Sequence, residues 1–355
     1  MSPAPTVLVI GGVGFIGRHV VTYLVENNLA SEIRVVDKVL PHTAFLNERQ
    51  NEAFRKVEKD GSSFDFVFNL AAETKYSMSE RFYEERIFLL STLNAKEAAK
   101  RGVKCFVEVS TAEIYQSDKK PSKEDAKIIP WTTIAKYKYR AEEELKKIPG
   151  LNLVILRPSI VYGMGATAGL TPRLVCGRVY QHLNEEMRCL WSKDLKINTV
   201  HVLDVARAIW HVAVWYRDNE KAGKGPFVYN LSDPGNTDQA KINGLITQIF
   251  GVKTGYHGSS IDKLAQHNLD GATDEVNDKH ATPWADLTRE SGIKATPLST
   301  YVDKELLYNN ALSVDGTKIV EETGFTYEVP EVTVEKLQEI IDDFKLNGLW
   351  PKDMI

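Results

Sequence analysis

The sequence predicts an α/β fold, in which a doubly wound, mostly parallel β-sheet carries helices on both faces and a smaller lobe follows it. Short apolar runs of strand character alternate along the chain with segments of helical periodicity, and this alternation is typical of parallel sheets. The 355 residues are enough for a substantial core. With 43% hydrophobic and 26% charged residues, the composition is that of an ordinary soluble globular protein.

The expected strands are short and rich in β-branched and aromatic residues. The run TVLVI at Thr6–Ile10 reads as a buried strand, and the segment 17–27 that follows it has helical spacing. Further strands are expected over 33–36, 65–70, 105–109, 151–156 and 227–230.

Long helices are expected over 79–101 and 133–148. The second carries Glu142 and Lys146 at the i,i+4 spacing that stabilises a helix. A last amphipathic helix closes the chain, with one apolar stripe that contains Leu337, Ile340, Ile341 and Phe344.

Composition also argues against several classes of partner. The net charge of −4 lacks the basic excess of proteins that bind nucleic acid or anionic membranes. No apolar run approaches the roughly 20 residues of a membrane helix, and the first residues lack a basic region before the apolar stretch, so no signal peptide is expected. The three cysteines form no CxxC pair and no His, Cys and Asp cluster has metal spacing, which predicts a cytoplasmic protein without a metal site.

The first strand leads directly into a glycine-rich turn. Gly11, Gly14 and Gly17 stand three residues apart, and a helix follows. The first glycine permits a tight turn, the second lets the backbone approach a pyrophosphate at the helix N-terminus, and the third lets helix and strand pack closely. This context predicts a dinucleotide-binding, Rossmann-type domain.

An acidic residue ends the second strand at the expected place. Asp37 lies 20 residues after Gly17, where a carboxylate accepts hydrogen bonds from the adenosine ribose. The same charge repels a 2′-phosphate, and Lys38 is the only basic residue beside it. We therefore expect NAD, and not NADP, as the cofactor.

At this point the sequence resembles the extended short-chain dehydrogenase/reductase family, also called the NAD-dependent epimerase/dehydratase family, over nearly the whole chain. The segments that carry the resemblance are GGVGFIG (11–17), FNLAAE (68–73), VEVSTAEIY (107–115), LRPSIVYG (156–163), NTVHVLDVARA (198–208) and FVYNLSDPG (227–235). Asn69 stands where the family usually has His, and Gln116 stands where it usually has Gly.

The resemblance implies roles for individual residues. Thr111 would orient the substrate, and Lys138 would bind the nicotinamide ribose and lower the pKa of a catalytic tyrosine. The residues implied to hold the cofactor are Gly11, Gly14, Phe15, Ile16, Gly17, Asp37, Lys38, Leu70, Ala71, Ala72 and Lys138.

The tyrosine itself is missing. The family's acid/base tyrosine precedes the lysine by four residues, and this chain has Ile134 there. General acid–base catalysis contributes roughly 10²–10⁴-fold, so ordinary alcohol–ketone chemistry should be impaired. Tyr137 lies about 60° further round the helix and is a catalytic candidate, with plain packing as the alternative.

Two further departures concern the substrate. The family's nucleotide-sugar enzymes usually carry Asn where this chain has Ile160, and often Arg where it has Ile197. Both losses point to a small, uncharged carbonyl or alcohol substrate. In addition, the usual third strand and its helix have almost no room before residue 65, so either the unit is absent or a stretch near Glu58 and Lys59 is missing.

The expected organisation is a Rossmann domain over 1–163 with 199–234, a substrate lobe over 164–198 and 235–330, and a C-terminal helix and tail over 331–355. By resemblance, the segments 79–101 and 133–148 would form a homodimer interface. Two functions stay open. One is an NAD-dependent oxidoreductase or isomerase with an atypical acid/base, and the other is a non-catalytic NAD-binding or redox-sensing protein.

Overall fold

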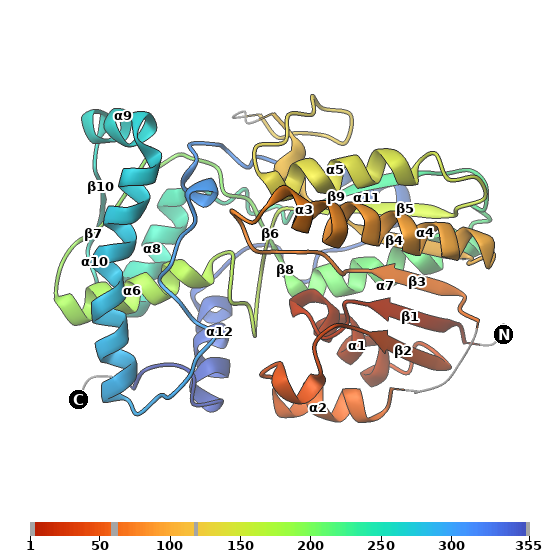
Figure 1. Cartoon of the computed structure of the whole chain (residues 1–355), viewed down its shortest axis with the longest axis horizontal. Coiled ribbons are helices and arrows are strands. Elements are labelled where there is room, and N and C mark those ends of the chain that lie inside the picture. The colour runs from red at the N-terminus through yellow and green to blue at the C-terminus, as the bar shows by residue number, and fades with distance from the viewer. Residues whose placement is uncertain (1–3, 58–62, 117–119, 353–355) are drawn as a thin grey trace.

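The computed structural model describes residues 4–57, 63–116 and 120–352, and it has two lobes that lie side by side (Figure 1). The larger lobe is built on a six-stranded sheet with the order β2-β1-β3-β4-β5-β9, in which every neighbouring pair is parallel. Its strands are β1 (Thr6–Ile10), β2 (Glu32–Val36), β3 (Phe66–Asn69), β4 (Cys105–Val109), β5 (Leu153–Pro158) and β9 (Phe227–Leu231). The predicted doubly wound fold is confirmed.

Helices cover both faces of this sheet, which explains why its strands are apolar on both sides. On one face, α1 (Phe15–Glu26) and α7 (Val202–Asp218) pack together over a core that includes Val7, Val9 and Phe68. On the other face, α4 (Leu90–Lys100) and α5 (Thr133–Leu145) lie side by side over Phe106 and Ile155 (Figure 1).

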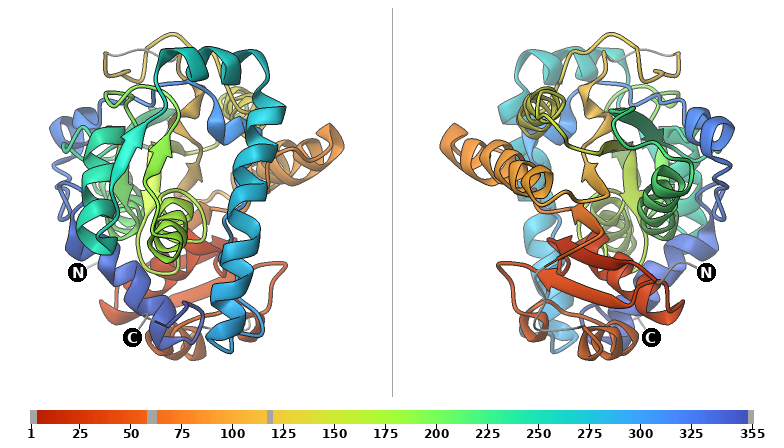
Figure 2. Two further views of the ribbon diagram at one scale, coloured as in Figure 1. Left: turned by 90° about the vertical axis from the view of Figure 1, so that its left-hand side faces the viewer. Right: turned by 90° about the vertical axis from the view of Figure 1, so that its right-hand side faces the viewer.

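The predicted helix 79–101 has a less regular interior than its periodicity suggested. It comprises α3 (Glu80–Tyr83), the π-helical segment η2 (Glu84–Leu89) and α4, and the residues at both junctions keep right-handed helical dihedrals. The three parts therefore form one continuous rod, which projects from the body of the molecule (Figure 2).

The strand β2 is the edge of the sheet among the described residues. Rossmann sheets usually carry another strand outside it. Here α2 (Glu48–Arg55) follows β2, and the chain enters β3 on the other side of β1. Glu58 and Lys59, where we considered a missing stretch, lie outside the described residues.

The smaller lobe has its own apolar core. The core is formed by α6 (Thr171–Leu183), α8 (Gln239–Phe250), α10 (Leu269–Glu290) and α12 (Val334–Leu346), with β7 (Met187–Cys189) paired to β10 (Thr254–Tyr256). The predicted apolar stripe of α12 is buried there. The remaining elements are η1 (Pro41–Thr43), η3 (Ala112–Ile114), β6 (Ile160–Tyr162), β8 (Thr199–His201), α9 (Ser259–His267), η4 (Lys304–Leu307) and α11 (Thr317–Thr323). Across the described ranges, every helix falls short of the length and apolar character that crossing a membrane requires.

Candidate active site

The glycine-rich turn is tightly packed against its neighbours. Gly11 has φ +79°, and a Cβ on it would lie 2.7 Å from the backbone nitrogen of Ala71. A Cβ on Gly17 would lie 2.2 Å from the Gly11 carbonyl oxygen. The turn thus brings β1, the loop after β3 and the start of α1 together, and leaves the first N–H groups of α1 without a side-chain cap. That arrangement fits a diphosphate.

Asp37 faces this turn from the end of β2. Its Oδ2 accepts a hydrogen bond from the Val13 backbone nitrogen at 2.9 Å, and its Oδ1 accepts one from the Val39 nitrogen at 2.9 Å. The carboxylate is therefore fixed beside the loop, and each oxygen keeps a lone pair for a sugar hydroxyl. Lys38 is exposed and lies 3.9 Å from Glu73.

The other residues implied to bind the cofactor also border the turn. Phe15 and Ile16 form the first turn of α1, and the Leu70 nitrogen donates to the Ile10 carbonyl at the end of β1. Ala71 touches Gly11, and Ala72 follows it in the same loop. The structure therefore groups Phe15, Ile16, Leu70, Ala71 and Ala72 around the turn, whereas Lys138 bonds to the end of β4.

The side chain of Lys138 reaches the carboxyl end of β4, where Thr111 follows the strand. The Lys138 amine donates to the Val109 carbonyl oxygen at 2.7 Å, two residues before Thr111. Burial lowers the pKa of Lys138, and the carboxylates of Glu108, Glu142 and Glu113 oppose that shift. This lysine is therefore a desolvated cation among acidic groups.

Ile134 lies in a small apolar cluster on the neighbouring turn of α5. The cluster contains Tyr83, Ile87, Ile134 and Tyr137, and Ile134 is 6% exposed. The Tyr137 ring centre lies 5.7 Å from that of Tyr83, and the Arg140 guanidinium lies 4.8 Å from the Tyr137 ring centre. Tyr137 therefore has the contacts of a packed side chain, and its catalytic role stays a prediction.

Sequence reasoning missed two buried carboxyl groups near this end of α5. Thr132 donates its hydroxyl to Glu113 Oε2 at 2.9 Å, and the Thr133 nitrogen donates to Glu305 Oε2 at 2.6 Å. Burial raises the pKa of Glu113, and the nearby Glu305 raises it further. Glu113 follows Thr111 by two residues, so its closeness in sequence to an implied site residue could have identified it as a candidate. Glu305 is 172 positions from Thr133, and no local pattern points to it.

A buried ion pair anchors α5 to the sheet. Arg157 of β5 donates through Nη2 to Glu142 Oε2 at 2.6 Å and through Nε to Oε1 at 3.1 Å. Its Nη1 donates to the Tyr115 hydroxyl at 2.8 Å. Because Glu142 is one turn after Lys138, the pair fixes the helix that carries the site.

His201 ends β8 and caps the start of α7. Its Nδ1 accepts a hydrogen bond from the Leu203 nitrogen at the start of α7, and burial lowers its pKa to about 3. In the parts of the chain that the structure describes, no three His, Cys, Asp or Glu side chains are grouped to hold a metal ion.

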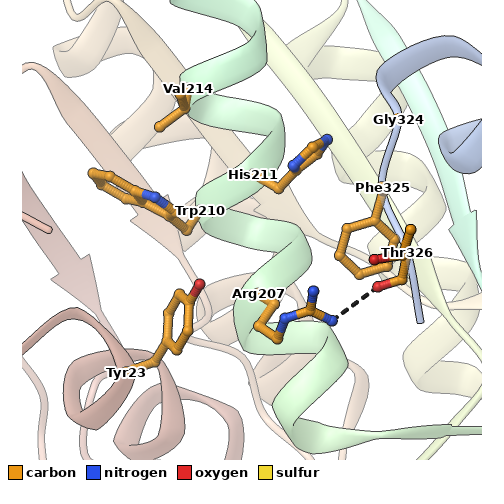
Figure 3. A pocket seen from close by; sticks show the side chains of 8 residues that line it. All are labelled: Tyr23, Arg207, Trp210, His211, Val214, Gly324, Phe325 and Thr326. Atoms are coloured by element: carbon orange, nitrogen blue, oxygen red, sulfur yellow. Dashed lines mark hydrogen bonds between the residues drawn. The ribbon is translucent and has the colours of Figure 1, made fainter. Parts of the chain in front are cut away.

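Two surface hollows are lined by residues other than those of the candidate site. One, between α1 and α7, is lined by Tyr23, Arg207, Trp210, His211, Val214 and residues 324–326, and Arg207 closes one side by donating to the Thr326 carbonyl oxygen at 2.8 Å (Figure 3). The other follows Asp37 in the chain and is lined by Pro41, His42, Thr43, Phe45, Leu46 and Asn51.

Comparison with known proteins identifies the family of the chain. A sequence model of the NAD dependent epimerase/dehydratase family matches residues 7–232. The N-acetyl-alpha-D-glucosaminyl-diphospho-ditrans,octacis-undecaprenol 4-epimerase of Escherichia coli O157:H7 is 30% identical over 169 residues, which cover 44% of this chain and 49% of that protein. The chain spans about half the length of the curated relatives it matches.

Solved structures share the fold over almost the whole chain. A UDP-glucose 4-epimerase of Thermotoga maritima, solved with UDP-glucose, has a TM-score of 0.62 and 20% identity, with 96% of this chain and 99% of that chain covered. The Bordetella bronchiseptica enzyme WbmG, solved with NAD and UDP, has a TM-score of 0.64 and 16% identity, with 98% of this chain and 96% of that chain covered. At these identities the likeness is one of fold.

Proposed function

The chain belongs to the NAD-dependent epimerase/dehydratase family, and we propose that it is an NAD-dependent oxidoreductase or isomerase that acts on a secondary alcohol or its ketone. NAD, when bound, supplies the hydride acceptor or donor. The chain's own residues must bind it, orient the substrate and move one proton. The observation that carries this proposal is the hydrogen bond from the Lys138 amine to the Val109 carbonyl oxygen at the end of β4, two residues before Thr111.

The nucleotide half of the site has a direct test. We expect calorimetry to give binding of NAD and much weaker binding of NADP, because Asp37 repels a 2′-phosphate. Asp37→Ala should weaken NAD binding, since two backbone nitrogens lose their acceptor and the ribose loses one as well. Equal affinity for NAD and NADP in the parent would refute the preference.

For the substrate, two kinds of support oppose one another. The curated relative named above is a 4-epimerase of a lipid-linked sugar, the Thermotoga maritima structure holds UDP-glucose, and the WbmG structure holds NAD and UDP. In this chain, however, the position where the family's nucleotide-sugar enzymes often carry Arg is Ile197, which is buried in the core of the smaller lobe. The guanidinium group of Arg173 already donates a hydrogen bond to the Gln239 side chain. We propose a small uncharged substrate on these grounds. Saturable turnover of UDP-glucose, with no turnover in a panel of neutral secondary alcohols, would overturn that choice.

A non-catalytic role is the second candidate, and one observation favours it. Ile134 is part of a closed apolar cluster, so the position that should transfer a proton contributes packing. Lys138→Met separates the two functions, because loss of a measurable parent activity supports an enzyme. A parent that binds NAD but turns over no probe, together with an Ile134→Tyr variant that gains activity, supports the non-catalytic reading.

We also propose a homodimer through the rod α3–η2–α4 and the adjacent α5. The rod projects from the body, and Leu89 and Leu93 on it are 40% and 62% exposed (Figure 2). Burying these leucines against a second copy would remove apolar surface from water.

A further inference from the structure

Two basic side chains lie near the carboxylate that is expected to bind the ribose. Lys38 follows Asp37 directly in the chain. Arg18 approaches it through Val13, whose backbone nitrogen donates to Asp37 Oδ2 at 2.9 Å and whose carbonyl oxygen accepts from Arg18 Nη2 at 3.1 Å. Proteins that bind NADP place a cation beside the 2′-phosphate of this ribose. The state of these two cations therefore affects the choice between NAD and NADP.

Arg18 is bound to the backbone of the glycine-rich turn. In addition to its bond with Val13, its Nε donates to the Gly14 carbonyl oxygen at 3.3 Å, and its Nη1 donates to the Phe45 carbonyl oxygen at 3.5 Å. Carbonyl oxygens from two segments thus orient the guanidinium group. These acceptors belong to the main chain, so a change of side chain does not remove them.

Lys38 pairs instead with a single side chain. Its Nζ lies 3.9 Å from Glu73 Oε2, and 69% of the Lys38 side chain is exposed. Glu73 belongs to the loop after β3, whereas Lys38 follows β2, and these two strands lie on opposite sides of β1. The pair therefore bridges the two loops that flank the glycine-rich turn.

Glu73 is held more firmly than Lys38. Its side chain is 6% exposed, and its Oε2 accepts a hydrogen bond from Arg86 Nη1 at 2.9 Å. Its Oε1 accepts from the backbone nitrogens of Thr74 and Lys75 at 3.1 and 3.2 Å. Burial opposes ionisation, but these donors and the Lys38 charge outweigh it and lower the pKa of Glu73. A fixed negative charge thus lies beside the Lys38 amine.

We propose that Glu73 determines the specificity for the cofactor, because its fixed carboxylate engages the Lys38 ammonium group and keeps it from neutralising a 2′-phosphate. The inference rests on the proposed function, since it concerns the nucleotide that the site takes. Asp37 disfavours NADP by repulsion, and Glu73 adds to this preference by occupying the cation that would compensate. Glu73 acts through Lys38 and is therefore a positioning residue.

Calorimetry with NAD⁺ and NADP⁺ on matched variants tests this inference, and the ratio of the two dissociation constants is compared. Glu73→Gln keeps the shape of the side chain and removes its charge. It should tighten NADP⁺ binding by about fivefold, the upper range for one exposed ion pair, while NAD⁺ binding changes by less than about twofold. Glu84→Gln is the control, because it removes the same charge from a surface pair with Arg140 and should leave the ratio unchanged.

Lys38→Met shows whether the gain comes from this lysine. In the parent background it should change the ratio by less than about twofold, because Glu73 already engages the amine. In the Glu73→Gln background it should remove the gain in NADP⁺ affinity completely. A gain that survives in Glu73→Gln/Lys38→Met would overturn the inference and assign the effect to the charge of Glu73 alone.

A change in the opposite direction is expected at Arg86, and this variant decides the case if Glu73→Gln does not fold. Arg86 is 45% exposed and shares Glu73 Oε2 with Lys38, so Arg86→Met leaves that oxygen to Lys38. NADP⁺ binding should weaken by about two- to threefold relative to NAD⁺ binding. An unchanged ratio, or a relative gain for NADP⁺, would contradict the inference.

Failure of the inference can be told apart from failure of the proposed function. If the parent binds neither NAD⁺ nor NADP⁺, the proposed function fails. If the parent prefers NAD⁺ and the ratio is the same in Glu73→Gln and Glu84→Gln, only the inference fails.

Discussion

Replacing Glu142 by Gln should destabilise the protein more than any neighbouring surface change. Glu142 is fully buried and takes a bidentate ion pair from Arg157, whose side chain is 3% exposed. Removing one charge leaves the other buried without its counter-ion, and such losses cost about 3–5 kcal/mol. The amide keeps the shape and one acceptor, so we expect about 3 kcal/mol. With an m-value of about 3 kcal/mol per M in urea, the unfolding midpoint falls by about 1 M.

Urea unfolding followed by both tryptophan fluorescence and far-ultraviolet circular dichroism measures this change. Glu143→Gln is the matched control, because Glu143 is 44% exposed and its pair with Lys146 is a surface pair. It should shift the midpoint by less than about 0.2 M. The double variant Glu142→Leu/Arg157→Met should be no less stable than either single variant, because both charges leave together. A midpoint for Glu142→Gln equal to that of the control would refute the reasoning.

Three further results are expected. Burial lowers the pKa of His19 to about 4, so the neutral form that the fold requires is present in full above pH 6.5, and about 3 kcal/mol of unfolding free energy is lost as the pH falls towards 4. In His19→Gln, the urea midpoint should therefore depend less on pH between pH 7 and 4.5 than it does in the parent. The same pH dependence in both proteins would contradict this. Gly17→Ala should abolish NAD binding in calorimetry, because its Cβ meets backbone, whereas Gly244→Ala inside α8 meets nothing within 4 Å and should add about 0.5–1 kcal/mol of unfolding free energy. Leu93→Asp should convert a dimer to a monomer in light scattering, while Leu264→Asp, at 70% exposure on α9, should leave the mass unchanged; a monomeric parent would disprove the interface.

The parts of the site that sequence could predict are local in the chain. The glycine turn and Asp37 are separated by one helix, and a pattern of spacings is enough to specify both. The fold class, the family and NAD were predicted from such patterns and are confirmed. The same reasoning overestimated the regularity of the helix over 79–101, whose middle segment is π-helical.

The unpredicted parts depend on tertiary contacts. Glu305 reaches the start of α5 from a segment 172 positions away, and Arg157 meets Glu142 only because β5 and α5 pack together. Such groups become visible only when the fold places them beside a residue that the sequence had already singled out.

The burial of Lys138 itself bears on the choice between an enzyme and a non-catalytic protein. An ammonium group loses several kcal/mol of hydration on leaving water, and the buried carboxyls of Glu108 and Glu113 carry the same kind of penalty. Burial raises the pKa of Glu108 to about 7, so this group is near the point of losing its charge. A fold that needed only packing here would be served as well by apolar side chains of similar volume. Retaining a desolvated lysine and a carboxyl group beside Thr111 is therefore better explained by proton transfer than by stability, and a Lys138→Met variant more stable than the parent would be the matching signature.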